Sequence, residues 1–76
     1  MYSKEKLLKR ISMVVNDSGL SREAFARRIG TSGATMFHWL RLRNEPSVYL
    51  IANICDEFDV SADWLIFGRG GYDKKN

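Results

Sequence analysis

The sequence predicts an all-α domain built from five short helices. Three observations lead to this prediction. Apolar residues recur at helical spacing almost everywhere, no segment alternates as a strand would, and serines stand where the helices are expected to begin. Serine is a favoured N-cap because its hydroxyl accepts a hydrogen bond from a free N–H of the first turn. With 76 residues, the chain has room for one domain and one modest core.

Caps and apolar stripes place each helix in turn. The expected ranges are 3–17, 21–30, 32–40, 47–58 and 61–67, with a loop at 41–45. Leu20 with Phe25, and Val60 with Leu65, have the spacing of hydrophobic staples at the second and fifth helix starts. The residues expected to face the core are Leu7, Leu8, Ile11, Val14, Val15, Phe25, Ala26, Ile29, Met36, Trp39, Ile51, Ile54, Cys55, Phe58, Trp64 and Leu65.

The domain is expected to span residues 1–68. A glycine-rich stretch at 68–71 then interrupts the helical pattern, so residues 69–76 are expected to form a flexible tail. No apolar run approaches the ~20 residues of a membrane span, and the chain start lacks the apolar stretch of a signal peptide. A cytoplasmic protein without membrane contact is therefore expected.

The content of reactive side chains argues against an enzyme. One cysteine and one histidine provide neither an internal disulfide nor a four-ligand zinc site, so we expect no metal and no cofactor. Cys55 falls on an apolar stripe and is interpreted as an inert core residue. No paired carboxylates, activated nucleophile or phosphate-binding glycine loop stand out.

Charge is distributed unevenly. Residues 1–43 hold nine Lys/Arg against three Asp/Glu, whereas residues 44–76 hold three against six. A basic half indicates either a surface for a polyanion or accidental clustering on a solvated surface. The basic residues of the first helix, among them Lys9 and Arg10, are interpreted as a solvated face that adds weak attraction for phosphate.

Residues 21–40 form the most informative segment. Two short helices meet there through a turn that contains Gly30, which tolerates the left-handed conformation of a sharp turn. Ala26 is small enough for the two helices to approach closely. Met36 and Trp39 anchor one face of the second of these helices, which leaves the opposite face free to enter a major groove.

These residues resemble phage-repressor and Cro-type domains, the lambda-repressor-like fold. The resemblance rests on residues 20–32 (LSREAFARRIGTS), on 36–39 (MFHW), on Pro46-Ser47 and on 60–65 (VSADWL), and it covers roughly residues 5–68. It implies that the third helix contacts DNA bases. The matching base-contacting positions are Gly33, Ala34, Thr35, Phe37 and His38; those at the DNA backbone are Arg22, Ser32, Arg41, Arg43 and Asn44.

The chain departs from the family pattern in three places. Its base-contacting positions lack the Gln, Asn and Arg that pair bidentately with bases. Val15 and Leu40 replace a common ion pair, which we interpret as a substitution of packed apolar side chains. Leu42 replaces a common glycine after the third helix, so the positions of Arg41 and Arg43 are less constrained.

The resemblance implies a DNA-binding transcriptional regulator, of the repressor kind and of phage or bacterial type. It is expected to bind duplex DNA as a homodimer, with Ile66 and Phe67 as candidate dimer contacts. Both a stand-alone protein and the N-terminal domain of a longer repressor fit the chain. The alternative is a protein-interaction module on the same fold, such as an antirepressor bound to another regulator protein, which the apolar Ala34 and Phe37 favour. For Phe37, packing into the core is also open, and for His38, a plain solvent-facing position.

Overall fold

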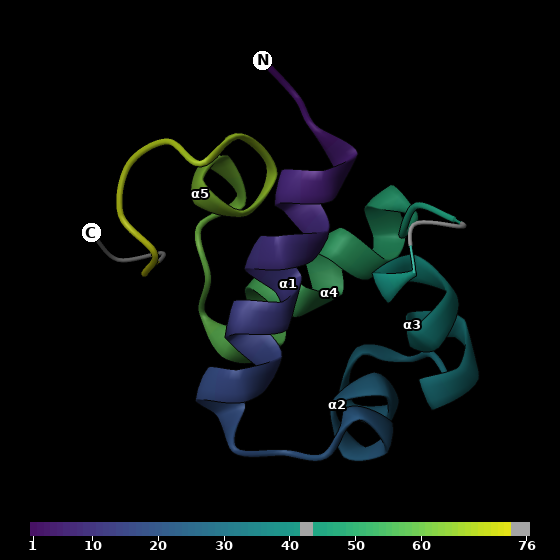
Figure 1. The fold of residues 1–76 in the computed structure, drawn as a ribbon. Helices are drawn as coiled ribbons and strands as arrows, with labels where there is room; N and C mark the ends of the chain where they lie inside the picture. The colour runs from purple at the N-terminus through teal and green to yellow at the C-terminus, as the bar shows by residue number, and fades with distance from the viewer. Residues whose placement is uncertain (42–43, 74–76) are drawn as a thin grey trace.

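The computed structural model describes residues 1–41 and 44–73 and confirms the all-α prediction. Five helices follow one another: α1 (Lys4–Ser18), α2 (Arg22–Ile29), α3 (Gly33–Leu40), α4 (Val48–Phe58) and α5 (Ala62–Phe67). In Figure 1, α1 crosses in front of α4, with α5 on one side and α2 and α3 on the other. The expected ranges agree with these bounds to within one or two residues.

A serine caps the start of every one of these helices. Each cap residue has extended backbone angles, and its Oγ accepts a hydrogen bond from the backbone N–H three residues later. The five pairs are Ser3 with Lys6, Ser21 with Ala24, Ser32 with Thr35, Ser47 with Leu50, and Ser61 with Trp64. Local hydrogen bonding therefore determines where each helix begins.

Left-handed residues end four of the helices. Glycines at positions 19, 30 and 68 follow α1, α2 and α5 with φ values of 73°, 89° and 70°. Helix α4 instead ends at Asp59, which has φ 58° and is the only non-glycine residue with positive φ in the described ranges. An L-residue with a Cβ atom is strained in this conformation, so the end of α4 carries a local energetic cost.

The core lies where α2 packs against α1, α3 and α4, and where α1 also packs against α3 and α5. Trp39 and Phe25 are its largest fully buried side chains, and the Phe25 ring stacks on that of Phe58 with centroids 4.5 Å apart. Four residues expected in the core are only partly buried and pack at its edge, because they lie on the flanks of their helices: Val15, Ile51, Phe58 and Trp64.

Arg10 joins the first helix to the last. Its Nε donates to the carbonyl oxygen of Leu65 at 2.7 Å, and its Nη2 donates to that of Ile66 at 2.8 Å. The interpretation of Arg10 as part of a solvated face was wrong, because the side chain is partly buried and satisfies carbonyl groups that the end of α5 leaves free. A Cβ at Gly68 would lie 2.9 Å from its Nη1, so the glycine makes room for the guanidinium.

The segment after α5 returns to the domain. The ring of Tyr72 lies 4.4 Å from that of Trp64, and the Tyr72 carbonyl oxygen accepts a hydrogen bond from the Ser61 N–H at 2.8 Å. Val60 and Asp73 also form a single antiparallel bridge. The interpretation of 69–76 as a tail does not account for these contacts, which bring residues 72–73 against the start of α5; residues 74–76 lie outside the described ranges.

Candidate nucleic-acid interface

Helices α2 and α3 meet through residues 30–32. The N–H of Thr31 donates to the carbonyl oxygen of Ala26 at 2.9 Å, and Ala26 itself is completely buried. From α4, the side-chain amide of Asn53 donates to the carbonyl oxygen of Ile29 at 2.8 Å. These contacts fix the end of α2 and the turn that leads into α3.

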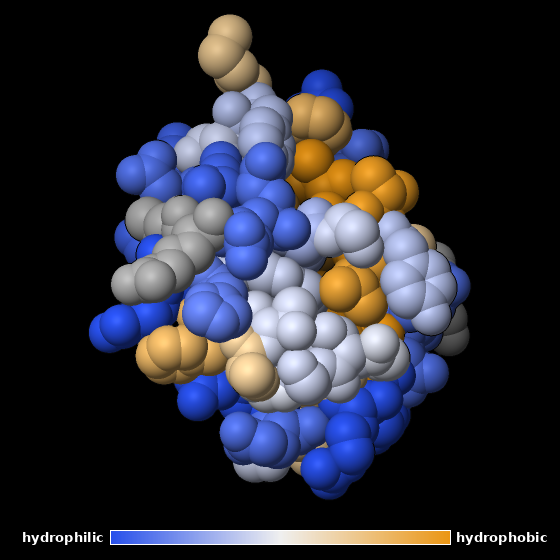
Figure 2. Space-filling view, turned by 90° about the vertical axis from the view of Figure 1, so that its right-hand side faces the viewer, coloured by the Kyte–Doolittle hydropathy of each residue, from blue (hydrophilic) through white to orange (hydrophobic). Residues whose placement is uncertain are grey.

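Helix α3 has one buried face and one open face. Met36 and Trp39 are buried, whereas Ala34, Phe37 and His38 are exposed, and Gly33 and Thr35 are half-buried. Figure 2 looks at the side of the domain that carries α3, where a pale centre borders blue hydrophilic residues below and an orange apolar area beside it. All five residues predicted to contact bases are thus accessible, at least in part, on this short helix.

The hydroxyl of Ser32 is occupied within the protein. It accepts a hydrogen bond from the Thr35 N–H at 3.1 Å and donates to the Thr35 Oγ1 at 3.0 Å. Both side chains therefore stabilise the first turn of α3. The methyl group of Thr35 remains the part of that residue best suited to an apolar contact with thymine.

Phe37 lies between two arginines from different elements. The guanidinium carbon of Arg22, at the start of α2, is 5.2 Å from the ring centroid, and that of Arg41, just after α3, is 4.9 Å from it. The His38 ring meets Phe37 edge-on at 6.2 Å. With 40% of its surface exposed, Phe37 does not pack into the core. Its ring instead contacts the guanidinium groups of Arg22 and Arg41 beside α3.

The remaining predicted backbone contacts are Asn44 and Arg43. Asn44 is exposed in the segment before α4, and Arg43, like Leu42, lies outside the described ranges. Arg28 of α2 is committed elsewhere, because its Nε is 3.0 Å from the Glu57 carboxylate and its guanidinium lies over Phe58. Arg22 and Arg41 are therefore the predicted backbone-contacting cations that the structure brings together.

Glu23 was not predicted as a site residue, yet it lies against the first residue of α3. A Cβ built on Gly33 would be 2.7 Å from the Glu23 Oε2 and 3.1 Å from its Cγ and Cδ. The carboxylate therefore occupies the space that a side chain at position 33 would take. No local sequence signal indicates this contact, because Glu23 and Gly33 lie on different helices, α2 and α3.

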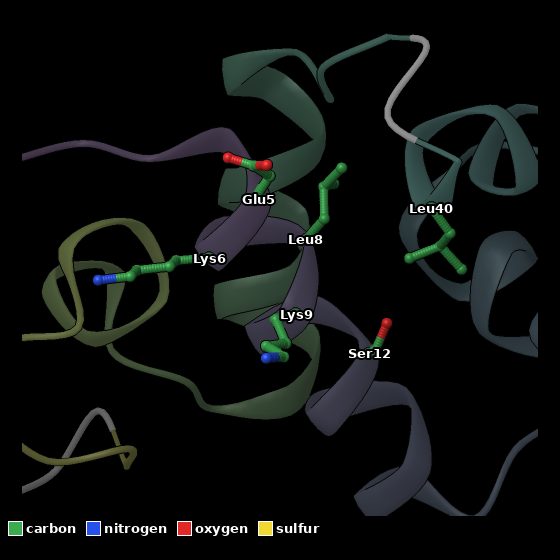
Figure 3. Close-up of a pocket in the computed structure, with 6 residues that line it drawn as sticks. All are labelled: Glu5, Lys6, Leu8, Lys9, Ser12 and Leu40. Atoms are coloured by element: carbon green, nitrogen blue, oxygen red, sulfur yellow. The ribbon is translucent and has the colours of Figure 1, made fainter.

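A hollow of about 330 Å³ separates α1 from the end of α3. Leu40 points into it toward Leu8 and Ser12 of α1, while Lys6 is directed to the opposite side of α1 (Figure 3). Leu40, expected to pack with Val15, thus lines this hollow, whereas Val15 packs against the core. Across residues 1–41 and 44–73, no three His, Cys, Asp or Glu residues gather as a metal site would require.

This arrangement defines the class of protein: a helix-turn-helix domain that binds DNA. Its helix α3 has one buried and one exposed face, and two arginine side chains lie beside the exposed face. A family model described as helix-turn-helix matches residues 11–65. The chain therefore belongs to the helix-turn-helix family of phage-repressor and Cro type. No curated protein and no solved structure matches it significantly. In the described part of the chain, no helix is long and apolar enough to cross a membrane.

Proposed function

We propose that the protein is a sequence-specific transcriptional repressor of phage or bacterial type, which acts in the cytoplasm as a homodimer. Each α3 enters a major groove, and two half-sites lie about one helical turn (~34 Å) apart. Gly33, Ala34, Thr35, Phe37 and His38 face base edges, and Arg22 and Arg41 contact phosphates. Occupation of a promoter then blocks transcription.

The main support for this proposal is that Arg22 and Arg41 both lie against the Phe37 ring. Arg22 and Arg41 come from opposite ends of the α2–α3 unit, yet both lie about 5 Å from one ring on the open side of α3. Guanidinium groups suit phosphate because they donate bidentately and remain charged. Two of them, held beside a helix that fits a major groove, match the phosphate backbone that borders that groove.

An apolar groove between α4 and α5 supports the homodimer. It has a volume of about 310 Å³, and its lining includes Val48, Ile51, Ala52 and Ile66. Val48 is 82% exposed, and Phe67, at the end of α5, is 40% exposed. Exposed apolar side chains of this kind favour contact with another chain. We assign this surface to a second copy, in agreement with the predicted contacts at Ile66 and Phe67.

The test is selection of binding sites from a random duplex pool, followed by affinity measurements over a range of salt concentrations. We expect an inverted repeat to be enriched. Arg22→Ala and Arg41→Ala should each weaken binding to it and lower the slope of log affinity against log salt by about one. Arg28→Ala is the matched control, because Arg28 also lies over a phenylalanine, Phe58, at 5.4 Å, but is paired with Glu57 and does not contact Phe37.

The second candidate is a module that binds another regulator protein. The exposed Ala34 and Phe37 favour it, because an apolar face suits a protein surface. If no sequence is enriched and the weak retention of DNA disappears with salt, the DNA-binding proposal fails. Loss of a protein partner on Phe37→Ala would then support the second candidate.

A further inference from the structure

We propose that Glu23 determines sequence specificity by accepting a hydrogen bond from the exocyclic amine of a cytosine in the major groove. This inference rests on the proposed function, because it requires α3 to enter that groove. It adds an acidic residue from α2 to a set of base contacts that was expected from α3 alone.

The Glu23 carboxylate lies beside the start of α3. Glu23 is an exposed residue in the first turn of α2, and its side chain runs over Gly33, the first residue of α3. The Oε2 lies 2.7 Å from the position that a Cβ at Gly33 would occupy. In docked helix-turn-helix domains, the N-terminal residues of the recognition helix contact base edges. In this protein the recognition helix is α3. The Glu23 carboxylate therefore takes the place of the missing side chain at position 33.

Within residues 1–41 and 44–73, the Glu23 carboxylate has no hydrogen-bond or salt-bridge partner, unlike Glu57 with Arg28 or Glu45 with Tyr2. An ionised carboxylate only accepts hydrogen bonds. When DNA displaces the water around it, a donor must replace that water, because an unpaired buried charge is costly.

Among the four bases, cytosine offers the hydrogen-bond donor that fits a carboxylate best. In the major groove, guanine offers only acceptors and thymine offers an acceptor and a methyl group, while cytosine and adenine carry an amine. Carboxylates characteristically accept from the cytosine N4 amine, and adenine adds the N7 acceptor, which would repel the second carboxylate oxygen. Cytosine is therefore the base that fits Glu23, at one position of each half-site.

Glu23→Gln tests the assignment, since glutamine pairs bidentately with adenine. We expect the selected site to change at one base pair, with the preference for cytosine falling by roughly tenfold to a hundredfold. Affinity for unrelated duplexes should rise slightly, because one negative charge near the phosphates is removed. Glu5→Gln is the matched control, since Glu5 is an exposed first-turn glutamate of α1.

Gly33→Ala provides a second, independent test. The new methyl group would displace the flexible end of Glu23, while the helical backbone at position 33 accepts alanine without strain. We expect this variant to remain folded and to lose preference at the same base pair as Glu23→Gln. If the wild-type protein selects a site and neither variant alters any base preference, the role of Glu23 is refuted while the proposed function stands. If the wild type selects no site, the proposed function itself fails.

Discussion

The guanidinium of Arg10 closes the domain by donating to the carbonyl oxygen of Leu65, 55 positions further along the chain, at a distance of 2.7 Å. Helices shorter than two turns, such as α5, gain little stability from their own hydrogen bonds. The bonds from Arg10 satisfy two carbonyl groups at the C-terminal end of α5 and connect this helix to α1.

Arg10→Met should therefore lower the free energy of unfolding by about 2 kcal/mol, because it keeps the apolar stem but removes both charged donors. Urea denaturation followed by circular dichroism measures the effect. Lys9→Met is the control: Lys9 is exposed, so the change should stay within about 0.5 kcal/mol. Equal effects from the two variants would contradict a structural role for Arg10.

Phe37→Leu should weaken DNA binding without changing the number of phosphate contacts. Leucine retains an apolar side chain but lacks the aromatic face on which Arg22 and Arg41 lie. Each exposed cation–π contact contributes about 0.5–1 kcal/mol, so we expect a loss of several-fold in affinity. Titrations at several salt concentrations should show an unchanged slope.

A double-mutant cycle adds a stricter criterion. Arg22→Ala and Arg41→Ala should show coupled effects on DNA affinity in the presence of Phe37, and additive effects in the Phe37→Leu background. Additive effects in both backgrounds would mean that the ring does not position the two cations together.

Tyr72 makes the free energy of unfolding depend on pH in the alkaline range. Burial, together with the hydrogen-bonded carboxylate of Asp17, raises the pKa of the Tyr72 hydroxyl from 10.0 to about 12. Between these two pH values the unfolded chain releases the proton while the folded protein retains it, so the free energy of unfolding falls as pH rises.

Tyr72→Phe keeps the ring but removes the ionisable hydroxyl. Urea denaturation at about pH 9 and about pH 11 should show a smaller loss of stability in this variant than in the wild type. Tyr2, whose pKa is also raised to about 12, titrates in both proteins and cancels in the comparison. An identical loss in both proteins would show that Tyr72 ionises equally easily in the folded and unfolded states.

Asp59→Gly should stabilise the protein by about 0.5–1 kcal/mol. The substitution relieves the left-handed backbone at the end of α4 and removes a negative charge from the negative end of the helix dipole. Thermal unfolding measures the gain. Asp59→Asn separates the two causes, because it removes the charge and keeps the Cβ atom.

Gly19→Ala is the converse experiment. Gly19 has φ 73°, and no atom lies within 4 Å of the position that a Cβ would take there, so the cost of about 1 kcal/mol reports backbone strain alone. A destabilised Asp59→Gly variant would show that the carboxylate makes a contact worth more than the strain.

Features that depend on neighbouring residues were predictable from the sequence. Ser21 and Ser32 cap their helices through N–H groups only three residues away, and Gly30 ends α2 through its own backbone conformation. The burial of Met36 and Trp39 followed from their spacing on one helix face. Caps and apolar spacing of this kind form the same sequence pattern whatever tertiary structure surrounds the helix.

Features that depend on distant segments were not predictable. The partners of Arg10 and Tyr72 lie on helices whose packing no local pattern specifies. The same holds for the candidate site: the contact between Glu23 and Gly33 depends on the angle between α2 and α3. The separation of Glu23 and Gly33 in the sequence does not indicate this contact.

The two tryptophans have a practical consequence, because they lie in separate parts of the domain. Trp39 is 2% exposed on the inner face of α3, whereas Trp64 is partly buried in α5 beside Tyr72. Replacing Trp64 by phenylalanine leaves one tryptophan fluorophore, Trp39, on the buried face of the helix proposed to enter the major groove. We expect its emission to report DNA binding by α3 in real time, without a label on the surface proposed to meet the DNA.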